Sequence, residues 1–160
     1  MKILILGIVA SGKTTLARKL SKKLKIKHYE IDSIVHDDNN LGKKRTIDEQ
    51  LKIFNDINKK SWILEGTPRN NQTYIINNAD IIYFIDLPLY LRKYRIIKRF
   101  IKQKLGIEKA NYKANFYMLK NMFKWTKDFE YKKESIMESL NKTNKLVIIK
   151  SKKEIKRLYK

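Results

Sequence analysis

The stretch Gly7-Ile8-Val9-Ala10-Ser11-Gly12-Lys13-Thr14 matches the pattern Gly-x-x-x-x-Gly-Lys-Ser/Thr at every fixed position. It follows the apolar run Lys2 to Gly7, which is typical of a central parallel strand covered on both faces. Directly after it comes Lys13 to Leu24, where apolar residues recur at helical spacing. The motif therefore lies between a predicted strand and a predicted helix, the context in which its backbone can surround phosphate oxygens. We predict that residues 7–14 form a phosphate-binding loop, called the P-loop below.

The residues of the P-loop have separate expected roles. Gly7 and Gly12 allow the chain to curl so that backbone N–H groups point inward at phosphate oxygens. Lys13 is expected to reach the β- and γ-phosphates of ATP or GTP, and the Thr14 hydroxyl to ligate Mg²⁺. The predicted nucleotide-binding set is Gly7, Ala10, Ser11, Gly12, Lys13, Thr14 and Thr15. The alternative is a chance Gly-Lys-Thr turn between a strand and a helix.

Outward from the P-loop, apolar runs of strand length alternate with amphipathic stretches of helix length. Further strands are predicted at 28–32, 61–65, 80–86 and 145–150, with helices after Thr46, around 74–76, from Pro88 to about Lys104, over 109–140 and after Ser151. This alternation predicts a three-layer α/β/α fold with a five-stranded parallel sheet. Residues 100–140 do not alternate with strands, so we expect a helical lid inserted there into one domain spanning residues 1–160.

The composition is strongly basic. The formal net charge is +21, which predicts an anionic partner: nucleotide phosphates, nucleic acid or an anionic membrane face. The alternative is a source genome rich in Lys, Ile and Asn codons, whose extra lysines lie on solvated faces. Without cysteine, disulfides, thiolate metal sites and a cysteine nucleophile are excluded. No apolar stretch reaches the roughly 18 residues that span a bilayer, and we expect a cytoplasmic protein.

Two later segments carry a resemblance to a known family. Glu65-Gly66-Thr67-Pro68-Arg69 follows the third predicted strand, and Ile85-Asp86-Leu87-Pro88 ends the fourth, with Arg95 and Arg99 downstream. With the P-loop, they resemble the adenylate-kinase-like superfamily of P-loop kinases, and most closely the small kinases labelled DNA topology modulation proteins. The resemblance implies that Arg69 holds the acceptor and that Glu65 belongs to the Mg²⁺ shell through water. It also implies that Arg95 and Arg99 stabilise charge on the transferring phosphoryl group.

These assignments have structural alternatives. Arg69 could lie on a solvated turn, and Glu65 could cap a helix or form a surface pair. The helix that carries Arg95 and Arg99 could simply present a solvated basic face, and Arg92 lies one turn earlier on nearly the same face.

Asp32 ends the second predicted strand, at the carboxyl edge of the sheet where open α/β folds bind ligands. It resembles the aspartate that shikimate-like kinases place near this point, which implies that Asp32 orients or deprotonates a hydroxyl acceptor. If the acceptor is already a phosphate, Asp32 would hold a sugar hydroxyl or a metal-bound water. The structural alternative is a helix N-cap. The segment lacks the Gly-Asp-x-x-Arg of adenylate kinases, so the acceptor stays open between a nucleotide-like and a hydroxyl compound.

A basic and aromatic stretch extends over residues 89–133, with fourteen Lys or Arg against three Asp or Glu. Such a stretch can bind single-stranded nucleic acid, or it can form an amphipathic lid whose aromatics pack together. The leading hypothesis is therefore an ATP-dependent kinase with a small acceptor. The rival is a nucleic-acid-associated P-loop protein, either a polynucleotide 5′-hydroxyl kinase or an ATP-switched DNA-binding protein. A third hypothesis is ATP hydrolysis without an acceptor.

Overall fold

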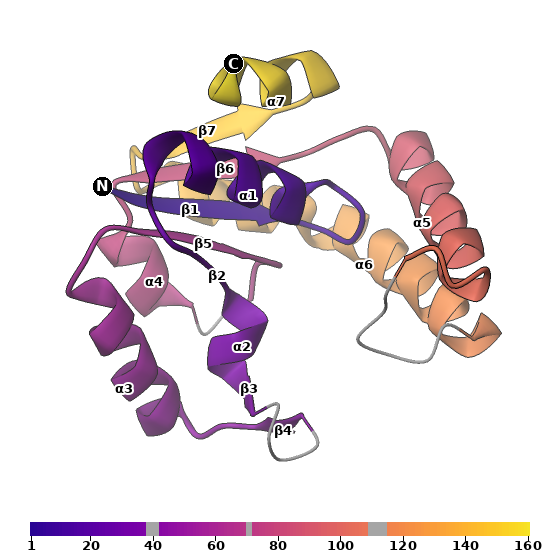
Figure 1. Ribbon diagram of the computed structural model, residues 1–160. Helices are drawn as coiled ribbons and strands as arrows, with labels where there is room; N and C mark the ends of the chain where they lie inside the picture. The colour runs from indigo at the N-terminus through magenta and orange to yellow at the C-terminus, as the bar shows by residue number, and fades with distance from the viewer. Residues whose placement is uncertain (38–41, 70–71, 109–114) are drawn as a thin grey trace.

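The computed structural model describes residues 1–37, 42–69, 72–108 and 115–160 (Figure 1). Its main sheet has five parallel strands in the order β2-β5-β1-β6-β7. These are β1 (Lys2–Gly7), β2 (His28–Glu30), β5 (Trp62–Gly66), β6 (Ile81–Ile85) and β7 (Leu146–Ile149). A short antiparallel pair, β3 (His36–Asp37) with β4 (Lys43–Lys44), stands apart and was not predicted. The predicted three-layer fold with a five-stranded parallel sheet is confirmed.

Helices cover both faces of this sheet (Figure 1). Ile3 and Ile5 of β1 pack on one face with α1 (Lys13–Leu24) and α7 (Lys152–Tyr159). Leu4 and Leu6 pack on the other face, which is covered by α2 (Ile31–Val35), α3 (Ile47–Asn58), α4 (Thr73–Asn78) and part of α6 (Phe116–Asn141). Successive side chains of a strand point to opposite faces, so a central strand must be apolar throughout. This explains the continuous apolar run that precedes the P-loop.

Local capping signals agree with the helix starts. Thr46 and Glu49 form a capping box at the start of α3, the helix predicted after Thr46, and each side chain accepts from the backbone of the other residue. Ser151 caps α7 by accepting from the Glu154 amide. Asn115 caps α6 by accepting from the Met118 amide, so this helix begins at Phe116. Residues 109–114 of the predicted 109–140 helix lie outside the described residues.

The second predicted strand was too long. Strand β2 ends at Glu30 and α2 begins at Ile31, so Asp32 lies in the first turn of a helix and not on a strand. The N-cap position belongs to Glu30, which also excludes the N-cap alternative for Asp32. The physical reason is packing: Ile31 and Ile34, at helical spacing, are both buried in the core. A short segment with so few apolar residues does not distinguish a strand from a helix until its packing partner is known.

The α5 helix (Leu89–Lys104) and the first half of α6 form an arm at the carboxyl end of the sheet (Figure 1). The second half of α6 returns to the sheet, where Phe129 stacks on Phe84 at a centroid distance of 6.1 Å and Leu140 is buried. The arm therefore has different bounds from the insertion expected at 100–140. It begins earlier, at Leu89, and it ends earlier, because the second half of α6 packs on the sheet. No helix in the described parts of the chain combines the length and apolar character that a membrane crossing requires.

Candidate active site

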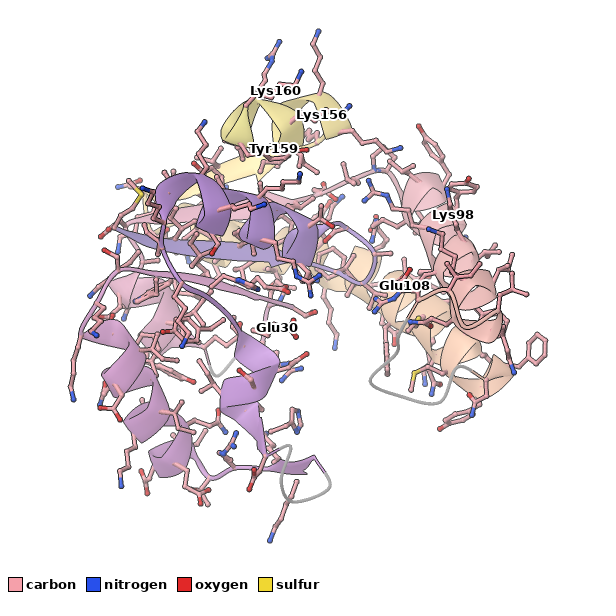
Figure 2. All side chains as sticks on the ribbon, in the orientation of Figure 1. Glu30, Lys98, Glu108, Lys156, Tyr159 and Lys160 are labelled. Carbon is pink, nitrogen blue, oxygen red and sulfur yellow. The ribbon has the colours of Figure 1, made fainter. Side chains whose placement is uncertain are left out.

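The parallel sheet brings several segments to one edge. The P-loop follows β1, Glu65 is near the end of β5, and Asp86 follows β6. Because the carboxyl ends of parallel strands share one edge of the sheet, segments that are distant in sequence become neighbours there. Open α/β folds bind their ligands at this edge. Figure 2 shows Glu30 at the end of β2, and Glu108 between α5 and the P-loop end of α1.

The P-loop needs its glycines for two reasons. At Gly7, an added Cβ would lie 2.8 Å from Ser11 Oγ and 2.9 Å from the Ile85 carbonyl oxygen, so any side chain would force the backbone apart. Gly12, at the N-cap of α1, has a φ of +103°, which residues other than glycine rarely adopt. The backbone of the P-loop is therefore held close to the end of β6 by contacts that only glycine allows.

Lys13 and Thr14 lie beside the buried Glu65. Lys13 Nζ donates to the Ile8 carbonyl oxygen at 3.2 Å, and Thr14 Oγ1 donates to Glu65 Oε1 at 2.5 Å. Burial lowers the pKa of Lys13, while the negative charge of Glu65 opposes that effect. Burial also raises the pKa of Glu65, against the effects of Lys13 and of the hydrogen bond from Thr14. The site therefore places an ammonium, a hydroxyl and a carboxyl together in a poorly solvated position.

These residues fit a polyphosphate with a divalent cation. Ser11 Oγ is buried and has no hydrogen-bond partner among the described residues, so the curl of the P-loop holds an unsatisfied polar group. Lys13, Thr14 and Thr15 occupy the first turn of α1, where backbone N–H groups lack intrahelical acceptors and the helix dipole favours an anion. Oxygen donors from Thr14 and Glu65 suit Mg²⁺, either directly or through water. The other residues predicted to bind the nucleotide, Gly7, Ala10 and Gly12, belong to the same loop as Ser11, Lys13 and Thr14.

Asp32 and Arg69 meet although they are far apart in sequence. Arg69 Nη2 donates to Asp32 Oδ1 at 2.7 Å, with side-chain exposures of 37% and 63%. Asp32 lies just after β2 and Arg69 just after β5, so this ion pair lies at the same carboxyl edge of the sheet as the P-loop. The two residues predicted to bind the acceptor are thus brought together, in a position that solvent and ligands can reach.

The turn that carries Arg69 is held by a glutamine that the sequence analysis missed. Gln72 is buried, accepts from the Arg69 amide at 3.2 Å and donates to the Thr67 carbonyl oxygen at 3.1 Å. Gly66 lets Ile31 approach, because an added Cβ there would lie 2.9 Å from the Ile31 side chain. A glutamine three residues beyond a Pro-Arg turn was the available signal, but polar residues in loops are too common to single it out.

Arg95 and Arg99 face the P-loop from successive turns of α5. Arg95 Nη1 donates to the carbonyl oxygens of Ala10 and Ser11, at 3.0 and 2.9 Å. Arg99 pairs with Glu108 at 3.2 Å, and its positive charge contributes to lowering the pKa of Lys13. Both guanidinium groups therefore add positive charge near the P-loop, and Arg95 contacts its backbone directly.

Arg92 has a different role. Its side chain is fully buried: Nε donates to the Leu87 carbonyl oxygen at 2.9 Å, and Nη2 pairs with Glu130 of α6. Lys133 of α6 completes the group by pairing with Asp86 at 3.0 Å. This ion-pair cluster, made of Arg92, Glu130, Lys133 and Asp86, joins the start of α5 to α6 and to the end of β6.

A cavity of about 290 Å³ adjoins this cluster. Its lining consists of Asp86, Leu87, Pro88, Leu89, Arg92, Glu130, Lys133 and Lys150. The Nη1 atom of Arg92 is buried without a partner among the described residues. Lys150 follows β7, so the cavity lies at the same carboxyl edge of the sheet as the P-loop.

No family model matches the sequence, and no curated protein sequence matches it. Among solved structures, the shikimate kinase of Acinetobacter baumannii in complex with shikimate is similar, with a TM-score of 0.61 and 13% identity, covering 99% of this chain and 88% of that one. The shikimate kinase of Bacteroides thetaiotaomicron has a TM-score of 0.59 and 11% identity, covering 99% and 96%. At these identities the likeness concerns the fold. The chain thus shares the three-layer α/β fold of these two shikimate kinases.

Proposed function

We propose that this protein is a kinase that transfers the γ-phosphoryl group of ATP or GTP to a small acceptor, with Mg²⁺. The observation that carries the proposal is the convergence of the P-loop with Glu65, the Asp32–Arg69 pair and Arg95 at one edge of the sheet. A chance Gly-Lys-Thr turn would not require these cations and carboxylates around it.

Each group has a specific task in this proposal. The P-loop amides and Lys13 bind the phosphates, and Thr14 with Glu65 holds Mg²⁺, Glu65 through water. Bound ATP supplies the reactive phosphoryl group. Arg99, with Arg95, places positive charge where the equatorial oxygens of that group gain negative charge. We place the nucleobase in the cavity beside Lys150, which lies at the same carboxyl edge of the sheet as the P-loop.

The Asp32–Arg69 pair defines the acceptor side. We propose an acceptor that presents a hydroxyl to Asp32 and an anionic group to Arg69, since a guanidinium can donate two parallel hydrogen bonds to a carboxylate or phosphate. A nucleotide acceptor would use the same pair differently, with its phosphate on Arg69 and a sugar hydroxyl on Asp32. Both acceptor classes fit a pair that is partly exposed and oriented by Gln72.

The test is an ADP-release screen over nucleoside monophosphates, nucleosides, small alcohols and hydroxy acids, and 5′-hydroxyl oligonucleotides. Lys13→Ala provides the blank, and Lys23→Ala, an exposed lysine on the same helix, is the matched control. We expect one soluble acceptor class to raise ADP release in the wild type and in Lys23→Ala, and not in Lys13→Ala. Activity that persists in Lys13→Ala would reject the P-loop as the nucleotide site.

The oligonucleotide arm of the screen tests the rival function. A polynucleotide kinase or ATP-switched DNA-binding protein should bind oligonucleotides with an affinity that falls steeply as salt rises. Equal ADP release with and without every acceptor would favour ATP hydrolysis alone. The narrower resemblance, to the kinases labelled DNA topology modulation proteins, and the single domain of residues 1–160 stay predictions from the sequence.

A further inference from the structure

Helix α5 carries an apolar face that the fold does not use. Five residues at helical spacing, called the α5 stripe, are exposed: Tyr90 (74%), Tyr94 (58%), Ile97 (46%), Ile101 (50%) and Leu105 (67%). The opposite side of the helix is the one that packs, with Arg92 and Ile96 buried. The helix is therefore apolar on a second side, at the periphery of the molecule (Figure 1). Single exposed apolar residues are ordinary, but a contiguous exposed stripe marks an interaction surface.

The charge around the α5 stripe restricts what can cover it. Helix α5 contains seven Lys or Arg and no Asp or Glu. At 100° per residue, Lys93 and Lys104 border one side of the stripe and Lys98 borders the other, and all three are exposed. Figure 2 labels Lys98 on this helix. An apolar stripe bordered by lysines on both sides complements a surface that is anionic outside and apolar beneath.

Two other occupants match this surface less well. A second copy of the chain would bring lysines against lysines, in a protein whose net charge is already +21. Single-stranded nucleic acid would use the basic residues and stack on Tyr90 and Tyr94, but stacking uses aromatic rings. The aliphatic centre of the stripe, Ile97 and Ile101, would gain nothing from it.

We propose that the α5 stripe docks the protein on an anionic lipid surface. In this arrangement the tyrosines and isoleucines enter the boundary between headgroups and acyl chains, while the flanking lysines contact acidic headgroups. Arg95 and Arg99 extend from a different side of the helix toward the P-loop, so the nucleotide site stays accessible. This inference does not depend on the proposed kinase activity.

The first test removes the apolar contacts without changing charge. The full chain is sedimented with vesicles of phosphatidylcholine alone or of phosphatidylcholine and phosphatidylglycerol at three to one. The wild type should bind only the anionic vesicles, and Ile97→Gln/Ile101→Gln should bind them at least about tenfold more weakly, because interfacial affinity scales with buried apolar area. The matched control Ile47→Gln/Val147→Gln, two exposed apolar residues elsewhere, should bind like the wild type. An unchanged affinity of the α5 variant would overturn the proposal.

The second test separates local from overall charge. Lys93→Gln/Lys98→Gln/Lys104→Gln should weaken binding by about a hundredfold, because each lysine near an anionic surface contributes on the order of 1 kcal/mol. Lys22→Gln/Lys23→Gln/Lys152→Gln removes the same net charge from other exposed positions and should have a much smaller effect. Equal losses in both triple variants would mean adsorption by net charge alone, which contradicts a docking face on α5.

A third measurement reports the position of the helix. Tyr94→Trp, compared with the wild type, should add emission that shifts to the blue on anionic vesicles and is quenched by brominated lipid. No shift would overturn the proposal. Two other results would also overturn it. Nucleic acid would be the occupant if an oligonucleotide displaces the vesicles while Ile97→Gln/Ile101→Gln keeps full vesicle affinity. A second copy would be the occupant if the wild type is a dimer that this variant dissociates. Circular dichroism melting checks that each variant is folded.

Discussion

At the scale of single residues, the candidate site concentrates charged groups where water is scarce. Glu65 is 4% exposed, and among the described residues it accepts a hydrogen bond from the Thr14 hydroxyl and is stabilised as a carboxylate by the positive charge of Lys13. Arg92 is 1% exposed and depends on Glu130 in the same way. Burying a carboxyl group such as that of Glu65 costs free energy, so its retention beside the P-loop supports a functional site there, whereas Arg92 belongs to the ion-pair cluster between α5 and α6.

The raised pKa of Glu65 predicts a pH-dependent stability. The folded state holds the Glu65 proton more tightly than the unfolded state, so the stability of the wild type relative to Glu65→Gln should fall as pH rises above the ordinary pKa of 4.5. Each unit of pKa elevation contributes about 1.4 kcal/mol. Urea unfolding of both proteins between pH 4 and pH 8 measures the difference, and Glu30→Gln, an exposed carboxylate nearby, is the control. A wild type that gains stability relative to Glu65→Gln on raising the pH would contradict this prediction.

Gly7→Ala should damage nucleotide binding more than it damages the fold. The new Cβ would lie 2.8 and 2.9 Å from Ser11 Oγ and the Ile85 carbonyl oxygen, so the P-loop backbone must move. We expect the affinity for a fluorescent ATP analogue to fall at least about tenfold, with a loss of stability of about 1–3 kcal/mol. Gly106→Ala, where φ is +70° and the added Cβ has open space, should lower stability slightly and leave ATP affinity intact. Equal ATP affinity in all three proteins would refute this account of Gly7.

At the scale of secondary-structure elements, α5 is the helix whose sides have different roles. One side of it is packed through Arg92 and Ile96, the next side reaches the P-loop through Arg95, and a third side carries the exposed α5 stripe. Arg92 and Arg99 lie on nearly the same side of the helix but about two turns apart, and Arg95 lies on the neighbouring side, so the three guanidinium groups reach different partners. Substitutions along this one helix should therefore have separable effects.

Arg95 and Arg99 should differ in what they affect. Arg95→Gln removes two hydrogen bonds to the P-loop backbone, so the Kd for ATP should rise about tenfold or more. Arg99→Ala should lower the rate of ADP release about a hundredfold or more and change the Kd for ATP less than threefold. Arg99→Lys should restore part of the rate. A loss of ATP affinity alone in Arg99→Ala would exclude the transition-state role of this residue.

The ion-pair cluster at the base of the arm should contribute to stability. Glu130→Gln leaves the buried Arg92 guanidinium without its carboxylate, which should lower the free energy of unfolding by about 3 kcal/mol. Glu138→Gln changes an exposed residue on the same helix and should have little effect. Thermal or urea unfolding provides the comparison. Equal stabilities of the two variants would mean that Arg92 finds another partner.

At the scale of the whole molecule, the excess of positive charge dominates. A net charge of +21 on 160 residues makes the folded state repel itself, and salt screens that repulsion over about 10 Å at 0.1 M. The melting temperature should therefore rise by several degrees between 20 and 300 mM NaCl. Replacing NaCl by sodium sulfate at equal ionic strength tests whether bound anions add to this effect. A melting temperature that falls with NaCl would show that favourable ion pairs outweigh the repulsion.

The P-loop and the five strands could be predicted because their signals are local. The P-loop motif is eight consecutive residues, and a strand buried on both faces is a continuous apolar run, as in Ile3 to Leu6. The N-cap residues Thr46 and Ser151 are equally local signals. Asp32 shows the limit of local signals. Residues 28–32 were predicted as one strand, but the packing of Ile31 and Ile34 in the core makes the end of this segment helical. The β3–β4 pair could not be predicted, because strands of two residues are too short to show a pattern of apolar residues.

The sequence by itself determined that a phosphate loop follows the first strand of a parallel α/β sheet, since the residues that shape this loop are adjacent in the chain. The tertiary structure alone decided which distant groups surround it: Asp32 meets Arg69 across 37 positions, and Arg95 meets the P-loop across about 85. It also directed Arg92 into the core while Arg95, three residues on, faces the P-loop. A helical pattern specifies the sides of a helix, but only packing against other elements specifies what each side touches.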